Sequence, residues 1–179
     1  MLFAHDTEVA LAAASALVNT AEEGTLESLA DLDAFLAGWG FTGSRKRDRA
    51  ELRAVQELRP RLRRLWQVDK DGAVDIVNEL LREARALPQL TKHDEWDYHL
   101  HATRPEQPLV ERMAVEAAMA FVDVIRTDEL ERLRICAAGD CENVLVDLSK
   151  NRSRRFCESG CGNRVAVAAY RARKKNVPG

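Results

Sequence analysis

Apolar side chains recur every three or four residues over most of the chain, which is the spacing of one face of an α-helix. The clearest stripe lies within residues 44–68 and consists of Leu52, Val55, Leu58, Leu62 and Leu65. The same spacing predicts helices over residues 6–20, 25–40, 44–68, 71–86 and 107–133. Ser44 is a candidate N-cap for the third helix, and Pro60 predicts a kink or a break within it.

The period changes to two between residues 95 and 102. There Trp96, Tyr98 and Leu100 alternate with polar residues, which is the pattern of a strand. Residues 87–91 can pair with this strand as a small hairpin. We therefore expect a mainly α fold, in which a helical N-terminal domain carries one small β-hairpin.

The charges are distributed unevenly, although the net charge is only −2. Nine basic residues and one acid lie between Lys150 and Lys175, while the rest of the chain has 18 basic and 28 acidic residues. Such asymmetry indicates that the C-terminal end meets a polyanion. The first residues are apolar but include Asp6 and Glu8 without a basic start, which is not typical of a secretory signal. No apolar run reaches membrane-spanning length, so we expect no membrane association and a cytoplasmic location.

All four cysteines of the chain fall in one pattern near the C-terminus: Cys136-x4-Cys141-x15-Cys157-x3-Cys161. Two close pairs joined by a longer arm are typical of four thiolates around one structural Zn²⁺. Buried free thiols and a rubredoxin-type iron site are the alternatives. Four thiolates leave no open position on the metal, so a catalytic zinc is not expected.

The arm between the two cysteine pairs predicts a hairpin of its own. Residues 143–148 alternate, residues 149–153 have turn composition, and residues 154–157 return toward the metal. Residues 162–175 predict a helix whose first turn lies beside the last cysteine. The expected module is a treble-clef-like or zinc-ribbon-like finger that ends in a helix.

The letters CGNR at residues 161–164 are the name-giving motif of the CGNR zinc finger, and the pattern from the first cysteine pair through VDLSKNRSRRFC to YRAR resembles that finger. ALVNT, SLADLDAFLAGWG and WDYHLHA resemble the ABATE domain that commonly precedes it in bacteria. The resemblance implies an ABATE-like domain over 1–131 and a CGNR-type finger over 132–179. It also implies zinc binding, DNA binding and stress-induced transcription regulation. Phe156 and Ala166 depart from the finger's pattern, which frequently has a tryptophan and a lysine there.

The basic residues of the finger divide into two groups. Four thiolates and one Zn²⁺ carry a net charge of about −2, which nearby arginines can offset. We expect Arg154, Arg155 and Arg164 to do so, with Arg164 also able to pair with Asp147 and Asn163 able to bond the local backbone. The others lie at the expected hairpin tip or at the end of the final helix, too far from the metal for this role. These candidate nucleic-acid contacts are Lys150, Arg152, Arg171, Arg173, Lys174 and Lys175.

The strand at 95–102 places His99 and His101 on one face and Trp96 and Tyr98 on the other. A polar strand face is one interpretation, and the wall of a pocket for a small-molecule effector is the other. No nucleophile–base pair or phosphate-binding glycine loop occurs, so we do not expect an enzyme. The sequence favours a DNA-binding regulator whose N-terminal domain senses a ligand or forms a homodimer. A zinc-stapled module that binds protein or RNA is the alternative.

Overall fold

Five helices form where the spacing of apolar residues places them. The computed structural model describes residues 3–93 and 96–175, with only the backbone for residues 93, 96, 97, 99 and 175. The helices of the N-terminal part are α1 (His5–Glu23), α2 (Leu29–Trp39), α3 (Arg49–Arg63), α4 (Lys70–Glu83) and α5 (Leu109–Arg126). None of the described helices is long and apolar enough to cross a membrane.

Helix α3 begins later than its apolar stripe suggests. Ser44 is not its N-cap; the Asp48 side chain accepts a hydrogen bond from the backbone N–H of Glu51 and caps it instead. The Glu51 carboxylate in turn accepts the backbone N–H groups of Lys46 and Arg47, at 2.9 and 3.0 Å. Residues 45–47 therefore curl around a buried carboxylate and do not join the helix.

Pro60 does not break α3, which runs on to Arg63. A proline lacks the N–H that would bond to the carbonyl four residues earlier. Here the Gln56 carbonyl accepts from the Nε of Arg59 at 3.2 Å, so the carbonyl stays bonded. The chain then tightens into a 3₁₀ turn, η1 (Arg64–Trp66), directly after the helix.

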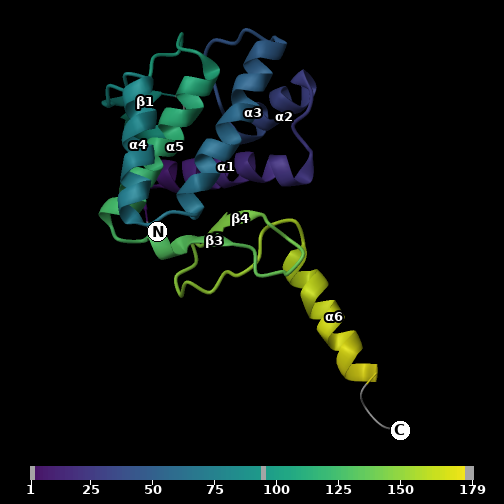
Figure 1. Cartoon of the computed structure of the whole chain (residues 1–179). Coiled ribbons are helices and arrows are strands. Elements are labelled where there is room, and N and C mark those ends of the chain that lie inside the picture. The colour runs from purple at the N-terminus through teal and green to yellow at the C-terminus, as the bar shows by residue number, and fades with distance from the viewer. Residues whose placement is uncertain (1–2, 94–95, 176–179) are drawn as a thin grey trace.

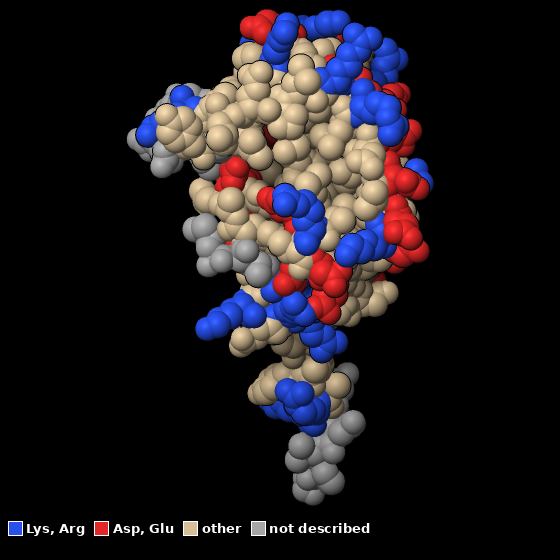
Figure 2. Space-filling view, turned by 90° about the vertical axis from the view of Figure 1, so that its left-hand side faces the viewer, with Lys and Arg blue, Asp and Glu red and all other residues tan. Residues whose placement is uncertain are grey.

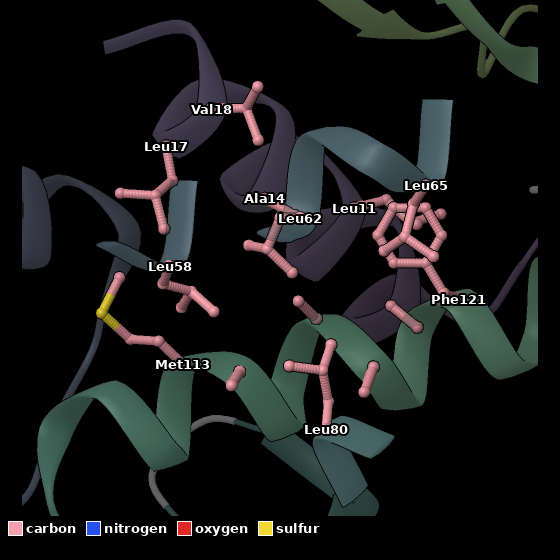
Figure 3. Packing of buried hydrophobic residues seen from close by; sticks show 14 of the residues in the cluster. Leu11, Ala14, Leu17, Val18, Leu58, Leu62, Leu65, Leu80, Met113 and Phe121 are labelled. Carbon is pink, nitrogen blue, oxygen red and sulfur yellow. The ribbon is translucent and has the colours of Figure 1, made fainter. Parts of the chain in front are cut away.

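The core lies between α1, α3, α4 and α5, whose apolar stripes face one another. Leu11, Leu62, Leu80 and Phe121 are almost fully buried there (Figure 3). Trp66 stands edge-on to Phe121, with ring centroids 5.3 Å apart. Each large apolar side chain buried in this way contributes about 1.5–3 kcal/mol, so burial is the main force that holds the helices together.

Two short hairpins complete the body. Strands β1 (Gln89–His93) and β2 (Trp96–His101) pair antiparallel as expected, with Leu90 opposite Leu100. The second hairpin differs from the expected one. After a 3₁₀ turn, η2 (Leu130–Arg132), strand β3 (Leu133–Ile135) pairs with β4 (Val144–Val146), so residues 154–157 are not the partner strand.

The β3–β4 hairpin packs directly against the helical body. All three residues of β4 are buried, so they do not alternate, and Val144 and Val146 belong to the main core. The Trp66 indole also donates to the Leu145 carbonyl at 2.9 Å. Beyond this hairpin the last helix, α6 (Cys161–Lys175), projects away from the body (yellow in Figure 1).

Candidate metal centre and nucleic-acid interface

The four cysteine sulfurs lie together where β3, the arm and α6 meet. All four Sγ atoms are within 4.8 Å of one another. The Cys141–Cys157 and Cys157–Cys161 pairs are separated by 3.8 and 3.5 Å. A tetrahedral zinc with bonds of about 2.3 Å requires sulfurs about 3.8 Å apart, so the observed spacing fits the metal. Because all four ligands come from the protein, the site holds one structural Zn²⁺.

Backbone hydrogen bonds close the first cysteine-bearing turn. Cys136 donates its N–H to the Asn143 carbonyl at 2.8 Å, and Cys141 donates to Ala138 at 3.1 Å. The second turn leads into α6, where Gly162 lets the Phe156 ring pack closely. A Cβ added at Gly162 would lie 3.2 Å from that ring, tighter than ordinary contact. Close packing against Phe156 therefore explains why the second residue of CGNR is glycine.

Arg164 faces the metal centre, but its carboxylate partner is not Asp147. Its guanidinium donates to the Cys161 sulfur at 3.3 Å and pairs with Asp140 at 2.9 Å. Asp140 belongs to the first cysteine turn, so this pair ties the start of α6 to that turn. Arg164 thus lies beside a thiolate, as expected, but its carboxylate partner is Asp140 and not Asp147. Asn163 is exposed beside it.

Asp147 organises the arm away from the metal. It is fully buried, accepts the backbone N–H groups of Ser149 and Arg154 at 3.0 and 2.9 Å, and pairs with Arg134 at 3.2 Å. Burial acts to raise the pKa of this carboxyl, but the hydrogen bonds and the Arg134 charge outweigh it and hold the pKa below its ordinary value. A charged Asp147 therefore fixes the 147–154 turn.

Two further arginines that were expected beside the thiolates face other groups. Arg154 pairs with Glu158, four residues later in the chain, at 2.9 Å. The Arg155 guanidinium lies 6.0 Å above the Phe156 ring. Among the described residues, only Arg164 is an arginine that donates to a cysteine sulfur.

The arm carries a second polar link to a thiolate, which the sequence did not reveal. Asn143 donates to the Cys157 sulfur at 3.8 Å and to the carboxylate of Glu23, at the end of α1, at 2.7 Å. Ser159 also hydrogen-bonds that carboxylate. Burial raises the pKa of the Cys157 thiol, but the Ser159 N–H and other donors lower it overall to about 7. This environment favours the thiolate that a metal needs.

Asn19 is a second residue of α1 that sequence reasoning missed. Its side chain donates to the Val144 carbonyl at 2.9 Å and accepts the Val144 N–H at 2.7 Å. One amide therefore satisfies both backbone groups of a β4 residue and joins the finger to the first helix. The signal was present in ALVNT, where a polar residue interrupts an otherwise apolar helix face.

The candidate nucleic-acid contacts do not share one environment. Arg152 was expected to be free at a hairpin tip, but its guanidinium pairs with Glu129 at 3.0 Å and also with Glu131. The loop folds back onto η2, which neutralises this arginine. Lys150 is exposed in the same loop.

Helix α6 carries the remaining candidates on an exposed surface. Every side chain from residue 163 to residue 174 is exposed, including Arg171, Arg173 and Lys174. The side chain of Lys175 lies outside the described residues. Figure 2 shows this helix at the lower end of the molecule, where basic side chains occur without acidic neighbours.

The residues expected to form an effector pocket are separated by the hairpin. His101 lines a cleft of about 700 Å³ beside β1 and β2, whereas Tyr98 is 71% exposed and lies on the opposite face of the strand. The side chains of Trp96 and His99 lie outside the described residues. Most of the cleft wall comes from positions that the sequence pattern did not single out, among them Arg85, Arg112 and Glu116.

Two family models match consecutive parts of the chain. Residues 132–174 match the CGNR zinc finger. Residues 11–128 match ABATE, described as a putative stress-induced transcription regulator. No curated protein matches the chain. The expected arrangement of domains is confirmed, and the chain belongs to the ABATE family, with a CGNR zinc finger following its helical domain.

Proposed function

We propose that this protein is a transcription regulator that binds DNA through α6 and through Lys150 of the 147–154 loop. The family match supports a regulator, and one structural observation supports the mode of contact. Helix α6 extends from the body, is exposed from residue 163 to residue 174, and carries five basic residues without an acid. Among the described elements it is the one whose shape and charge suit insertion into a groove.

The geometry of α6 suits a DNA major groove. At 1.5 Å per residue, a 15-residue helix is about 22 Å long, and the major groove is wide enough to admit a helix. At 3.6 residues per turn, Arg171 and Arg173 lie on nearly opposite faces of the helix. A helix in the groove would therefore present basic side chains to the phosphates on both sides. Its central residues are small, which favours close approach.

The zinc centre and the body hold this helix in place. Cys161 is both a zinc ligand and the first residue of α6, and Arg164 ties the same turn to Asp140. Asn19 and Trp66 fix β4, and with it the finger, to the helical body. A signal received by the ABATE domain can therefore reach the DNA-contacting helix through packed residues. In this proposal that domain senses a ligand or forms a homodimer, the protein acts in the cytoplasm, and it is not an enzyme.

An exposed apolar pair on α6 favours a second function. Val167 and Tyr170 are 39% and 60% exposed and lie three residues apart, on one side of the helix. Such a pair fits the groove of a partner protein, which is how many amphipathic helices bind. The finger would then be a zinc-stapled interaction module without sequence-specific DNA binding. RNA is less favoured, because the finger offers few aromatic side chains for base stacking.

A salt titration distinguishes these functions. Fluorescence anisotropy would follow the zinc-loaded protein binding to a labelled duplex from the promoter of its own gene, over a series of salt concentrations. Four phosphate contacts, from Lys150, Arg171, Arg173 and Lys174, predict a slope of log K against log salt of roughly −4. Absence of binding at low salt would contradict the DNA proposal and leave the protein-binding function.

A charge-reversed variant locates the contact. R171E/R173E/K174E should weaken binding strongly and reduce the magnitude of the slope by about 3. Residues 45–64 form a second segment rich in basic residues, and K46E/R49E/R53E makes the same change of charge on exposed residues there; this variant is the matched control. If both variants lose affinity equally, net charge drives binding and α6 is not the contact.

A further inference from the structure

A cleft of about 700 Å³ opens on the ABATE domain, far along the chain from the zinc centre. One wall is the face of the β1–β2 hairpin that carries Gln89, Thr91 and His101. The opposite wall comes from α5 and from the loop that precedes it. This volume lies within the range of sites that bind small molecules. The cleft has no part in the DNA contact proposed above.

The charges around this cleft favour an anion. Arg85, Arg104 and Arg112 line it together with a single acid, Glu116. Arg85 and Arg104 are exposed, and neither forms an ion pair with a carboxylate within the described ranges. Other exposed arginines of the chain, Arg82 and Arg126 among them, also have no ion pair with a described residue, so the shared concave site is what distinguishes these two. Two arginines that remain available in one concave site can bind a carboxylate, with which a guanidinium forms parallel hydrogen bonds.

Arg112 makes the base of the cleft rigid. It is only 5% exposed, and its guanidinium donates to the Thr42 carbonyl and, at 2.6 Å, to the Ser44 carbonyl. Gly43 between them has a φ of +93°, and a Cβ there would lie 1.9 Å from Nη1 of Arg112. Only glycine lets this loop close over the guanidinium. The wall is therefore built around a buried cation and is not a gap between mobile side chains.

Two buried polar atoms of the wall retain unused hydrogen-bonding capacity. In the part of the chain that the structure describes, neither Nε of Arg112 nor Oγ1 of Thr91 has a hydrogen-bond partner. Most buried polar groups in folded proteins are bonded, so each exception calls for an explanation. Both residues line the same cleft, on opposite walls. Both atoms are covered by protein, so they show that this wall is less fully hydrogen-bonded than an ordinary protein interior, without themselves facing a ligand.

Arg85 occupies a position where the backbone favours glycine. Its φ is +49°, and the Ala86 N–H bonds back to the Leu81 carbonyl at 2.9 Å, as in the usual helix C-terminus that ends in glycine. A side chain in this conformation costs free energy that glycine would avoid. Arg85 therefore adopts a backbone conformation that costs free energy, and its side chain lines the cleft.

Glu116 gives the cleft a second polar function. Its side chain is exposed within the cleft, yet protein lies close around it, and this desolvation raises the pKa of the carboxyl to about 7, while the Arg112 charge opposes the rise. Water in the cleft screens part of the effect. A carboxyl that is partly protonated near neutral pH can donate a hydrogen bond to a ligand oxygen as well as accept one.

We propose that this cleft binds a small organic acid, with its carboxylate held by Arg85 and Arg104 and its apolar body against Leu87. The arginines select the charge, and Leu87 with Pro105 supplies an apolar surface. This assignment rests on the proposed regulatory role of the ABATE domain and names the class of its effector.

Isothermal titration calorimetry on the zinc-loaded full chain tests the assignment with three probes at matched ionic strength. These are benzoate, its uncharged isostere benzamide, and inorganic phosphate. Benzoate should show saturable binding, and the other two should not. Equal binding of benzamide, binding of phosphate as tight as benzoate, or no saturable binding of benzoate would overturn the proposal. The titration contains no DNA, so its failure and the failure of the DNA-binding proposal are separate results.

Variants locate the probe. R85Q/R104Q should weaken benzoate binding at least about tenfold, the loss expected for charge-assisted hydrogen bonds. R82Q/R126Q removes the same charge from exposed arginines on α4 and α5 that do not line the cleft, and should change it less than about twofold. R85G keeps or raises stability, since glycine suits the left-handed backbone, and should still weaken binding. Equal affinity in R85G, R85Q/R104Q and the parent chain would place benzoate elsewhere.

Discussion

The Asn19 side chain joins the finger to the helical body, and its removal tests whether the two fold as one unit. In N19A, the N–H and the carbonyl of Val144 both lose their partner, and Val144 is only 1% exposed. A buried backbone group left without a partner costs about 1–3 kcal/mol. The two losses together should lower the free energy of unfolding by about 2–4 kcal/mol.

Urea unfolding followed by circular dichroism, with zinc in excess, measures this loss. With a dependence on urea of about 3 kcal/mol per M, the midpoint should fall by roughly 1 M. S15A is the matched control, because the Ser15 hydroxyl bonds only to the Ala12 carbonyl of its own helix. It should change stability by less than about 0.5 kcal/mol.

The same variant should also change the metal centre. Val144 follows Asn143, whose side chain bonds the Cys157 sulfur, so a loosened β4 should release zinc to a chelator faster than the parent chain does. The reasoning would be refuted if N19A unfolded at the same urea concentration as S15A. It would also be refuted if N19A lowered stability without changing the rate of zinc release, because the link between helix and finger would then be absent.

Three further changes test other contacts. C157S should lose zinc and unfold the finger, since the metal supplies on the order of 10 kcal/mol to such modules; a folded finger with one bound zinc per chain would contradict this. The pKa of Glu51 is lowered from 4.5 because the N–H of Lys46 and other donors outweigh burial. Its stabilisation is present above pH 4.5 and is lost as the pH falls through the lowered value, so E51Q should flatten the acid limb of unfolding. R152A should leave the salt slope of DNA binding unchanged, because Glu129 already neutralises this arginine.

Features that depend on local sequence could be predicted with few errors. The helices follow from apolar spacing, and the metal centre follows from four cysteines in two close pairs, because both signals lie within short segments. The errors came from contacts between distant segments. Ser44 fits the sequence pattern of an N-cap. The Glu51 carboxylate, however, accepts the backbone N–H of Lys46, so the chain before Asp48 forms a loop and the helix begins later. The strands β3 and β4 have three residues each, too few for a period to be recognised, so their pairing leaves almost no sequence signal.

The site residues show the same division. The role of Arg164 beside a thiolate was predictable from its distance of three residues from Cys161, but the choice of Asp140 over Asp147 depends on how the arm folds. Arg152 differs from Arg171 only in its surroundings, since the first meets acids of η2 and the second meets solvent. The charge of a residue can be read from the sequence, whereas the presence of its counter-ion requires the fold.

Because α6 is exposed along most of its length, packing against the rest of the protein does little to stabilise it. An isolated helix of this length is marginal in water, because the cost of the first turn is recovered only slowly along the chain. Here the first turn is set by Cys161 and Arg164, so the metal centre provides the nucleus and the remaining turns propagate from it. The helix–coil balance of α6 then depends on zinc occupancy. Loss of the metal should therefore convert the proposed DNA-contacting helix to coil and lower its affinity for DNA.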